Sequence, residues 1–304
     1  MYLEKIKINS DRYPTHKFYP FNIAILNNTT ELTFRSPVVI FVGENGSGKS
    51  TFLEAITRKC GIHIWDKPKR HLAHENPYET RLADYISVTW SNGRVPGSLF
   101  RAETFHDFAD FLDDVALCDP GRLKYHGGRI LNVLSHGEGI LSYFSTRYHI
   151  KGLYFLDEPE SALSPSRQIE FLNLLQRLEA RGHAQFIIAT HSPILLAYPG
   201  AQIFSFDSDN IKEIAYKDTT HYRIYEQFFA DRDAFLHTLF GFAPLRISGN
   251  HDRLRGIHWR GCSQRFTEAC HIGTEIFDIT EQTGVDGHEK VADVLSIRLL
   301  HVHG

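Results

Sequence analysis

The chain has 304 residues, which suits one large α/β domain with additions or two domains. Hydrophobic residues make up 42% and charged residues 23%, as in ordinary globular proteins, and no apolar run approaches the ~18 residues of a membrane span. A formal net charge of −3 provides no global basic field, so nucleic-acid binding would need a local patch or a partner.

Cysteine usage points to a reducing compartment, and the histidines show no metal-site spacing. The four cysteines have no C-x-x-C spacing, and no basic, apolar leader precedes them. The eighteen histidines lack the paired spacing of a zinc site. We therefore expect a soluble, cytoplasmic protein with no membrane span of its own.

The N-terminal segment is predicted to form antiparallel strands. Apolar residues alternate in part over residues 1–9, and two short apolar runs flank the turn pair Asn27-Asn28. The next run, residues 38–42, is β-branched and apolar on both faces, as expected for a strand buried in a parallel sheet.

Residues 43–51 fit the G-x-x-x-x-G-K-[ST] pattern of a phosphate-binding loop, the P-loop. Its glycines allow φ > 0 and close backbone approach, and the helix predicted from Lys49 to near Gly61 adds the positive end of its dipole. Lys49 would neutralise the β/γ-phosphates of ATP and Ser50 would bind Mg²⁺. The alternative, a glycine-rich turn with a solvated lysine, fits the strand-to-helix context poorly. The nucleotide-binding candidates are Gly43, Glu44, Asn45, Gly46, Ser47, Gly48, Lys49, Ser50 and Thr51.

A cluster of four aromatic residues over residues 13–21 precedes this loop: Tyr13, Phe18, Tyr19 and Phe21. One of them is a candidate to stack on an adenine ring. Core or edge-strand packing is the more ordinary role of any single one.

Residues 62–120 are loosely patterned. Prolines and Gly97 indicate loops around a short strand over residues 85–90. A helix follows, in which Thr104 and Asp107 resemble a capping box and apolar residues recur at helical spacing from Phe105 to Val115.

The segment Leu134-Ser135-His136-Gly137-Glu138 precedes a helical run over residues 140–148. Taken alone, it is typical of a helix start, with Ser135 as the cap and Glu138 at the third position.

A short apolar strand over residues 152–156 delivers two acids, Asp157 and Glu158, at its carboxyl end. Ligands of open α/β sheets lie beyond the carboxyl ends of the strands, so Asp157 is expected beside the P-loop, where it would hold Mg²⁺. Glu158 would then orient or deprotonate the attacking water. An acidic strand-end loop without this role is the alternative.

The C-terminal half continues the α/β alternation. Ser164 and Pro165 resemble the N-cap and first residue of a helix, and a strand over residues 186–189 ends at Thr190-His191, which would place His191 near a γ-phosphate. A hairpin over residues 203–216 and a helix or helix pair over residues 222–240 follow. Residues 241–304 differ in composition, with frequent Gly, Thr, Arg and His, and show helical periodicity only briefly around residues 291–300.

Together, these motifs resemble ABC-type ATPases. More narrowly, the chain is similar to stand-alone bacterial predicted ATPases of the "AAA family" that are related to the SMC and RecF-type proteins. The resemblance covers residues 1–240. It implies an α/β P-loop fold with a mainly parallel sheet, flanking helices and an N-terminal antiparallel region. We expect an ATPase domain over residues 1–240, with a helical and signature subdomain inserted at 62–150, and an appended segment over 241–304.

The resemblance also implies roles for individual residues. Residues 43–51 match Walker A, Asp157 matches the Walker B acid, and Glu158 matches the catalytic glutamate. Residues 161–164 match the D-loop, and His191 matches the switch histidine. The signature motif corresponds to residues 135–138, so that Ser135 and Gly137 would contact ATP bound by a second subunit. The implied enzyme is a Mg²⁺-dependent ATP hydrolase that works as an ATP-dependent, head-to-tail homodimer. It would act on a protein or nucleic-acid partner that these motifs do not name.

The chain departs from the pattern of transporters at two places. Its signature reads Ser-His-Gly-Glu, where transporters usually have Ser-Gly-Gly-Gln. No glutamine occurs between Thr51 and Arg167, so the Q-loop residue is missing, and Glu103 is the candidate to replace it. Three alternative functions stay open: a transporter subunit, a RecF-like DNA-associated ATPase without coiled-coil arms, and an ATP-binding switch with little hydrolysis.

Overall fold

The computed structural model describes residues 1–65, 76–119, 121, 130–131 and 134–240. All of them lie within one compact unit, Met1–Pro244. The predicted helical periodicity at 291–300 and the whole appended segment 241–304 lie outside the described residues.

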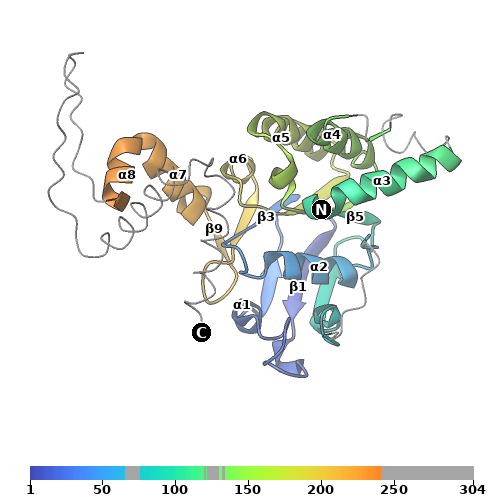
Figure 1. Ribbon diagram of the computed structural model, residues 1–304. Coiled ribbons are helices and arrows are strands. Elements are labelled where there is room, and N and C mark those ends of the chain that lie inside the picture. The colour runs from blue at the N-terminus through green and yellow to red at the C-terminus, as the bar shows by residue number, and fades with distance from the viewer. Residues whose placement is uncertain (66–75, 120, 122–129, 132–133, 241–304) are drawn as a thin grey trace, which may run out of the picture. The chain divides into compact units, whose positions relative to one another are not determined.

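Within the described residues, strands form two sheets (Figure 1). The larger sheet has the order β5-β6-β7-β3-β8-β9 and the smaller one has the order β2-β1-β4. In the larger sheet, the pairs from β5 through β8 are parallel and β9 is antiparallel. The smaller sheet is antiparallel throughout. The strands of the larger sheet are β3 (Val38–Val42), β5 (Gly97–Arg101), β6 (Gly152–Asp157), β7 (Ala184–Ala189), β8 (Gln202–Ser205) and β9 (Lys212–Ile214).

The smaller sheet consists of β1 (Leu3–Ile8), β2 (Glu31–Thr33) and β4 (Ile86–Trp90). The predicted N-terminal antiparallel region is therefore confirmed for residues 1–9, and it includes the strand predicted at 85–90. The α-helices are α1 (Ala24–Asn28), α2 (Lys49–Lys59), α3 (Ala102–Cys118), α4 (His136–Arg147), α5 (Pro165–Ala180), α6 (Pro193–Leu196), α7 (Thr220–Ala230) and α8 (Arg232–Phe240). Short 3-10 turns occur at Ser10–Arg12, Arg81–Tyr85, Pro159–Ala162 and Tyr216–Asp218.

The larger sheet separates two hydrophobic cores, because successive side chains of a strand point to opposite faces. On β3, Val39 and Phe41 join the core that contains Phe52 of α2 and the buried residues of the smaller sheet. The intervening Val38, Ile40 and Val42 join the core formed with α4, α5 and α6. Figure 1 shows α2 on one side of the sheet and α4 and α5 on the other. The predicted α/β fold, with helices on both faces of a mainly parallel sheet, is confirmed.

Three local predictions were wrong. The apolar run before Asn27 forms the helix α1, in which Ile25 and Leu26 are buried, instead of a strand. The segment around Gly97, expected as a loop, is the edge strand β5. The helix α3 begins at Ala102, so Thr104 lies inside its first turn and is not its cap.

Several helix boundaries agree with the sequence. Ser164 caps α5 by accepting a hydrogen bond from the Arg167 amide, and Pro165 is the first helical residue. Ser135 and Glu138 form the predicted capping box at the start of α4. The C-terminal helical region is a pair, α7 and α8, joined at Asp231.

Candidate active site

The P-loop lies between the end of β3 and the start of α2. Gly48, the N-cap of α2, has φ of 99°, a left-handed conformation that side chains strain to adopt, and a Cβ atom there would lie 3.0 Å from Ile23. A Cβ atom at Gly43 would lie 2.8 Å from the Cβ of Phe206. Backbone conformation and close packing therefore both require glycine at these positions.

Lys49 is buried and folds back over the loop. Its Nζ donates hydrogen bonds to the carbonyl oxygens of Gly43 at 2.7 Å and Glu44 at 2.9 Å. Burial lowers the pKa of Lys49, and the nearby acids, with Glu158 first among them, oppose that shift. The ammonium is thus held at the mouth of an anion-binding loop, close to several carboxylates.

Asp207 supports the loop from the other side, although the sequence indicated only a hairpin turn there. The strand β8 ends at Ser205, and Asp207 Oδ1 accepts a hydrogen bond of 2.7 Å from the Glu44 amide. This bond holds Glu44 and the start of the P-loop against the end of β8.

Asp157, at the carboxyl end of β6, contacts the first turn of α2. The Ser50 hydroxyl donates a hydrogen bond of 2.8 Å to Asp157 Oδ1. Burial raises the pKa of Asp157 to about 6, against the hydrogen bond from Ser50 and the charge of Arg101. Two hard oxygen atoms next to a phosphate loop fit Mg²⁺, which keeps several waters and takes one or two protein ligands together with substrate phosphates. Mg²⁺ would be held here by Ser50 and Asp157.

Arg101 and Glu54 form a second layer behind Asp157. Arg101 Nε lies 4.0 Å from Asp157 Oδ2, and an Arg101 guanidinium nitrogen pairs with Glu54 Oε2. Burial acts to raise the pKa of Glu54, but Arg101 and Arg58 hold it below its usual value. Glu103, the suggested Q-loop replacement, is exposed in the first turn of α3, and its charge contributes to the raised pKa of Asp157.

Glu158 has a strained backbone, with φ of 46° and ψ of 52°. Among the described residues it is the one residue other than glycine with positive φ, and such strain is typical of functional sites. His191 Nε2 lies 3.4 Å from Glu158 Oε1. Burial and the charge of Lys49 lower the pKa of His191. The sequence-predicted Asp157, Glu158 and His191 thus surround the P-loop lysine.

The signature residues contact a different part of the chain. Ser135 and Gly137 begin α4, which packs near the segment after β6, and the backbone of Gly137 adjoins Ala162 and Arg167. Glu138 pairs with Arg167 at 2.9 Å. The hydrogen bond with Ser135 is the main cause of the lowered pKa of Glu138.

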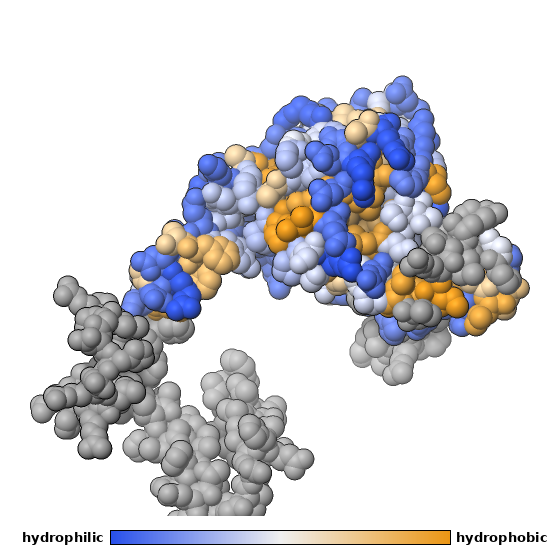
Figure 2. Space-filling view, turned by 90° about the horizontal axis from the view of Figure 1, so that it is seen from above, coloured by the Kyte–Doolittle hydropathy of each residue, from blue (hydrophilic) through white to orange (hydrophobic). Residues whose placement is uncertain are grey.

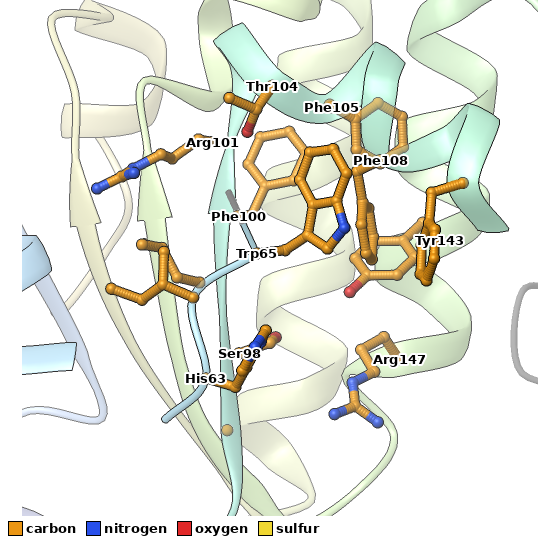
Figure 3. Close-up of a pocket in the computed structure, with 14 residues that line it drawn as sticks. His63, Trp65, Ser98, Phe100, Arg101, Thr104, Phe105, Phe108, Tyr143 and Arg147 are labelled. Carbon is orange, nitrogen blue, oxygen red and sulfur yellow. The ribbon is translucent and has the colours of Figure 1, made fainter. Parts of the chain in front are cut away.

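A separate hollow lies between β5, α3 and α4 and has a volume of about 430 Å³. Figure 3 shows the rings of Trp65, Phe108 and Tyr143 gathered on one side of it, with Arg147 below them. Arg101 also lines this hollow and so links its wall to Asp157.

Comparison with known proteins agrees with this geometry. Residues 109–197 match a family model described as an AAA domain, putative AbiEii toxin, Type IV TA system, and residues 19–84 match a second AAA-domain model. Together with the geometry of the P-loop and the strand ends, these matches support an ABC-type P-loop ATPase. Members of this family are ATP hydrolases.

A curated relative of this chain is the energy-coupling factor transporter ATP-binding protein EcfA2 of Methanospirillum hungatei. It is 27% identical over 210 residues, which cover 60% of this chain and 49% of the relative. The chain therefore spans about half the length of that protein.

Solved structures similar to this chain include the SMC head domain from Thermotoga maritima. It is 18% identical, the match covers 71% of this chain and 99% of that chain, and the TM-score is 0.39. Another is cbiO1 from Clostridium perfringens, part of the ABC transporter complex cbiONQ. It has 17% identity, coverage of 69% and 90%, and a TM-score of 0.40. At these values neither structure is a guide to what this chain acts on.

The surface of the protein is mixed in polarity. Figure 2 shows hydrophobic patches on one face, separated by hydrophilic residues. Among the described residues, no helix combines the length and apolar character needed to cross a membrane.

Proposed function

We propose that this ATPase binds Mg·ATP at residues 43–51 and hydrolyses it with Glu158 and His191. The observation that carries the proposal is the meeting of Ser50 and Asp157 beside the P-loop, because it joins a hard-cation site to a phosphate site. Mg²⁺, when bound, would neutralise charge on the β- and γ-phosphates.

The protein residues divide the remaining tasks. Lys49 and the loop amides bind the phosphates, and Ser50 and Asp157 hold the cation. Glu158 accepts a hydrogen bond from the attacking water and takes up its proton as attack on the γ-phosphorus proceeds. His191 donates a hydrogen bond from Nε2 to a γ-phosphate oxygen and thereby orients it.

Tyr19 is the proposed partner of the adenine ring. Its hydroxyl lies 3.0 Å from Thr51 Oγ1 in the first turn of α2, and its side chain is exposed. The other three aromatic candidates are less suited, because Tyr13 and Phe21 are buried in the core and Phe18 stacks on Tyr78.

We further propose that the active enzyme is a head-to-tail homodimer in which Ser135 and Gly137 reach the γ-phosphate of the partner subunit. In this chain the N-terminus of α4 is exposed at Ser135 and is already capped by Glu138. Its amides and dipole favour an anion, and the P-loop of the same chain serves a separate phosphate site. ATP would then form part of the interface, and its hydrolysis would weaken the dimer.

The partner that such a cycle moves or clamps is a protein or a nucleic acid. A second candidate function, the nucleotide-binding subunit of a transporter, is favoured by the similarity to EcfA2. The two are separated by capture of partners with the ATP-locked Glu158→Gln protein in the presence and absence of membranes. A membrane protein that is retained only with ATP supports the transporter, whereas soluble protein or nucleic acid supports the clamp.

A further inference from the structure

His221 contacts the histidine that the proposed function places beside the γ-phosphate. It lies in the first turn of α7, and its Nε2 atom is 3.2 Å from Nδ1 of His191. The ring centroids are 5.3 Å apart with an interplanar angle of 52°, so the rings meet through their nitrogen atoms and do not stack. On the opposite side of the His191 ring, Nε2 lies 3.4 Å from Glu158 Oε1.

For the two rings to form a hydrogen bond, one of the two facing nitrogen atoms must carry a proton. Of two neighbouring imidazole nitrogens, one must donate and the other accept. Burial, together with the charge of Lys49, lowers the pKa of His191, which favours a neutral ring at neutral pH. A neutral ring carries its proton either on Nδ1, facing His221, or on Nε2, facing Glu158.

The surroundings of His191 select between these tautomers. With the proton on Nδ1, the lone pair of Nε2 would face the Glu158 carboxylate and any bound phosphate, which also only accept hydrogen bonds. With the proton on Nε2, His191 can donate to either group, while Nδ1 accepts from the Nε2–H of His221. The buried Nδ1 atom of His221 has no hydrogen-bond partner. In this arrangement it carries a lone pair, so that no buried N–H group of His221 is left without an acceptor.

We propose that His221 is a positioning residue that holds His191 in the Nε2–H tautomer, so that His191 presents a hydrogen-bond donor to the γ-phosphate. The identity of that acceptor rests on the proposed function. Among the described residues, His191 Nε2 is buried and makes no hydrogen bond, so it remains available to a ligand.

The inference also couples α7 to the active site. His191 follows β7, whereas His221 belongs to a helix that packs against α6 and the 3-10 turn at Tyr216–Asp218. The first turn of α7 must therefore be in place for His191 to keep its tautomer.

The first test reads the tautomer directly and needs no turnover. In the full chain labelled with ¹⁵N-histidine, His191→Gln identifies the signals of His191 by their loss. We expect the wild-type spectrum to show His191 protonated on Nε2. The variant His221→Gln places an amide N–H₂ group where the Nε2–H of histidine lies and should preserve that tautomer. His221→Asn keeps an amide with a shorter reach and should give a mixture. An unchanged tautomer in a folded His221→Asn protein contradicts the proposal, as does its loss in His221→Gln.

The second test is kinetic. His221→Asn should lower kcat for ATP by about tenfold, a typical loss for an orienting partner, with KM changed less than about twofold. His221→Gln should stay within about threefold of the wild type. The control Arg232→Gln breaks a surface pair with Asp233 in the following helix α8 and should have no effect on either constant. Equal loss in His221→Gln and His221→Asn overturns the positioning role. Absence of turnover in the wild type would instead overturn the proposed function, and the tautomer test would still decide this inference.

Discussion

The Ser50 hydroxyl and the Asp157 carboxylate, 107 positions apart in sequence, are joined by a hydrogen bond of 2.8 Å. The parallel pairing of β3, β7 and β6 brings them together, because it places the carboxyl ends of these strands at one edge of the sheet. Through this contact, the phosphate-binding loop and the proposed cation ligand Asp157 form one site.

Lys49→Ala should abolish measurable ATP binding. The substitution removes the cation held at the mouth of the P-loop, and the phosphates would then face only amides and nearby acids. Binding is measured by titration with a fluorescent ATP analogue in the presence of Mg²⁺. Lys59→Ala, at the far end of the same helix, is the control and should bind normally. Normal binding by a folded Lys49→Ala protein contradicts the assignment of the loop.

Asp157→Asn should stabilise the protein in the absence of nucleotide. Because burial raises the folded-state pKa of Asp157 from 3.8 to about 6, ionisation of this group opposes folding. The free-energy cost of ionising Asp157 in the folded protein is absent at low pH, develops between about pH 4 and pH 6, and is complete above pH 6. The variant keeps an oxygen that accepts from Ser50.

We therefore expect thermal unfolding of Asp157→Asn at pH 7.5 to occur at least about 2 °C above that of the wild type. The difference should shrink toward pH 4. A difference that grows as the pH falls would show that the carboxylate is stabilised by its partners instead of penalised by burial.

Asp207→Ala should weaken ATP binding by about tenfold, the scale of one lost hydrogen bond to a charged group. The substitution removes the acceptor of the Glu44 amide and loosens the start of the P-loop. Asp207→Asn retains an oxygen acceptor and should bind within about threefold of the wild type. Calorimetric titration with a non-hydrolysable ATP analogue measures both. Equal affinities for the two variants would exclude the support role of this hydrogen bond.

Ser135→Arg should leave ATP binding intact and prevent ATP-dependent dimerisation, since it places bulk and positive charge at the exposed N-terminus of α4. Light scattering after size-exclusion chromatography in Mg·ATP, with the substitution combined with Glu158→Gln to slow hydrolysis, measures the mass of the particle. The Glu158→Gln protein alone should be a dimer and the double variant a monomer. Wild-type turnover by Ser135→Arg would show that the segment 135–138 is only a capped helix start.

Local sequence signals predicted the parts of the site that depend on one strand and the turn after it. Residues 43–51 follow a fully apolar strand, and Asp157 and Glu158 end another, so parallel pairing was enough to bring them close. His191 followed from the same rule applied to β7.

Residues that reach the site through tertiary packing carried no such signal. Asp207 looked like any turn residue, and His221 lay at the start of a helix with no motif around it. Arg101 depends on β5, which the sequence pattern hid because Pro96 and Gly97 indicate a loop. Gly97 is in fact required by close packing, since a Cβ atom there would lie 2.0 Å from the carbonyl oxygen of Leu153.

The wrong prediction of a strand before Asn27 has a related cause. Ile23-Ala24-Ile25-Leu26 is a short apolar run, and periodicity cannot separate a strand from a buried helical turn over four residues. Packing decided the outcome, because α1 buries Ile25 and Leu26 in the core beneath the smaller sheet.

The central claim is that this chain hydrolyses Mg·ATP with Asp157 and Glu158 in different roles. Turnover and nucleotide affinity of the wild type, Asp157→Asn and Glu158→Gln, measured side by side with and without Mg²⁺, test it most directly. The wild type should hydrolyse ATP only with Mg²⁺. Glu158→Gln should bind Mg·ATP normally and turn over at least about 100-fold more slowly, whereas Asp157→Asn should lose the Mg²⁺-dependent part of its affinity. Equal loss of binding in both variants, or wild-type turnover by Glu158→Gln, would contradict the account.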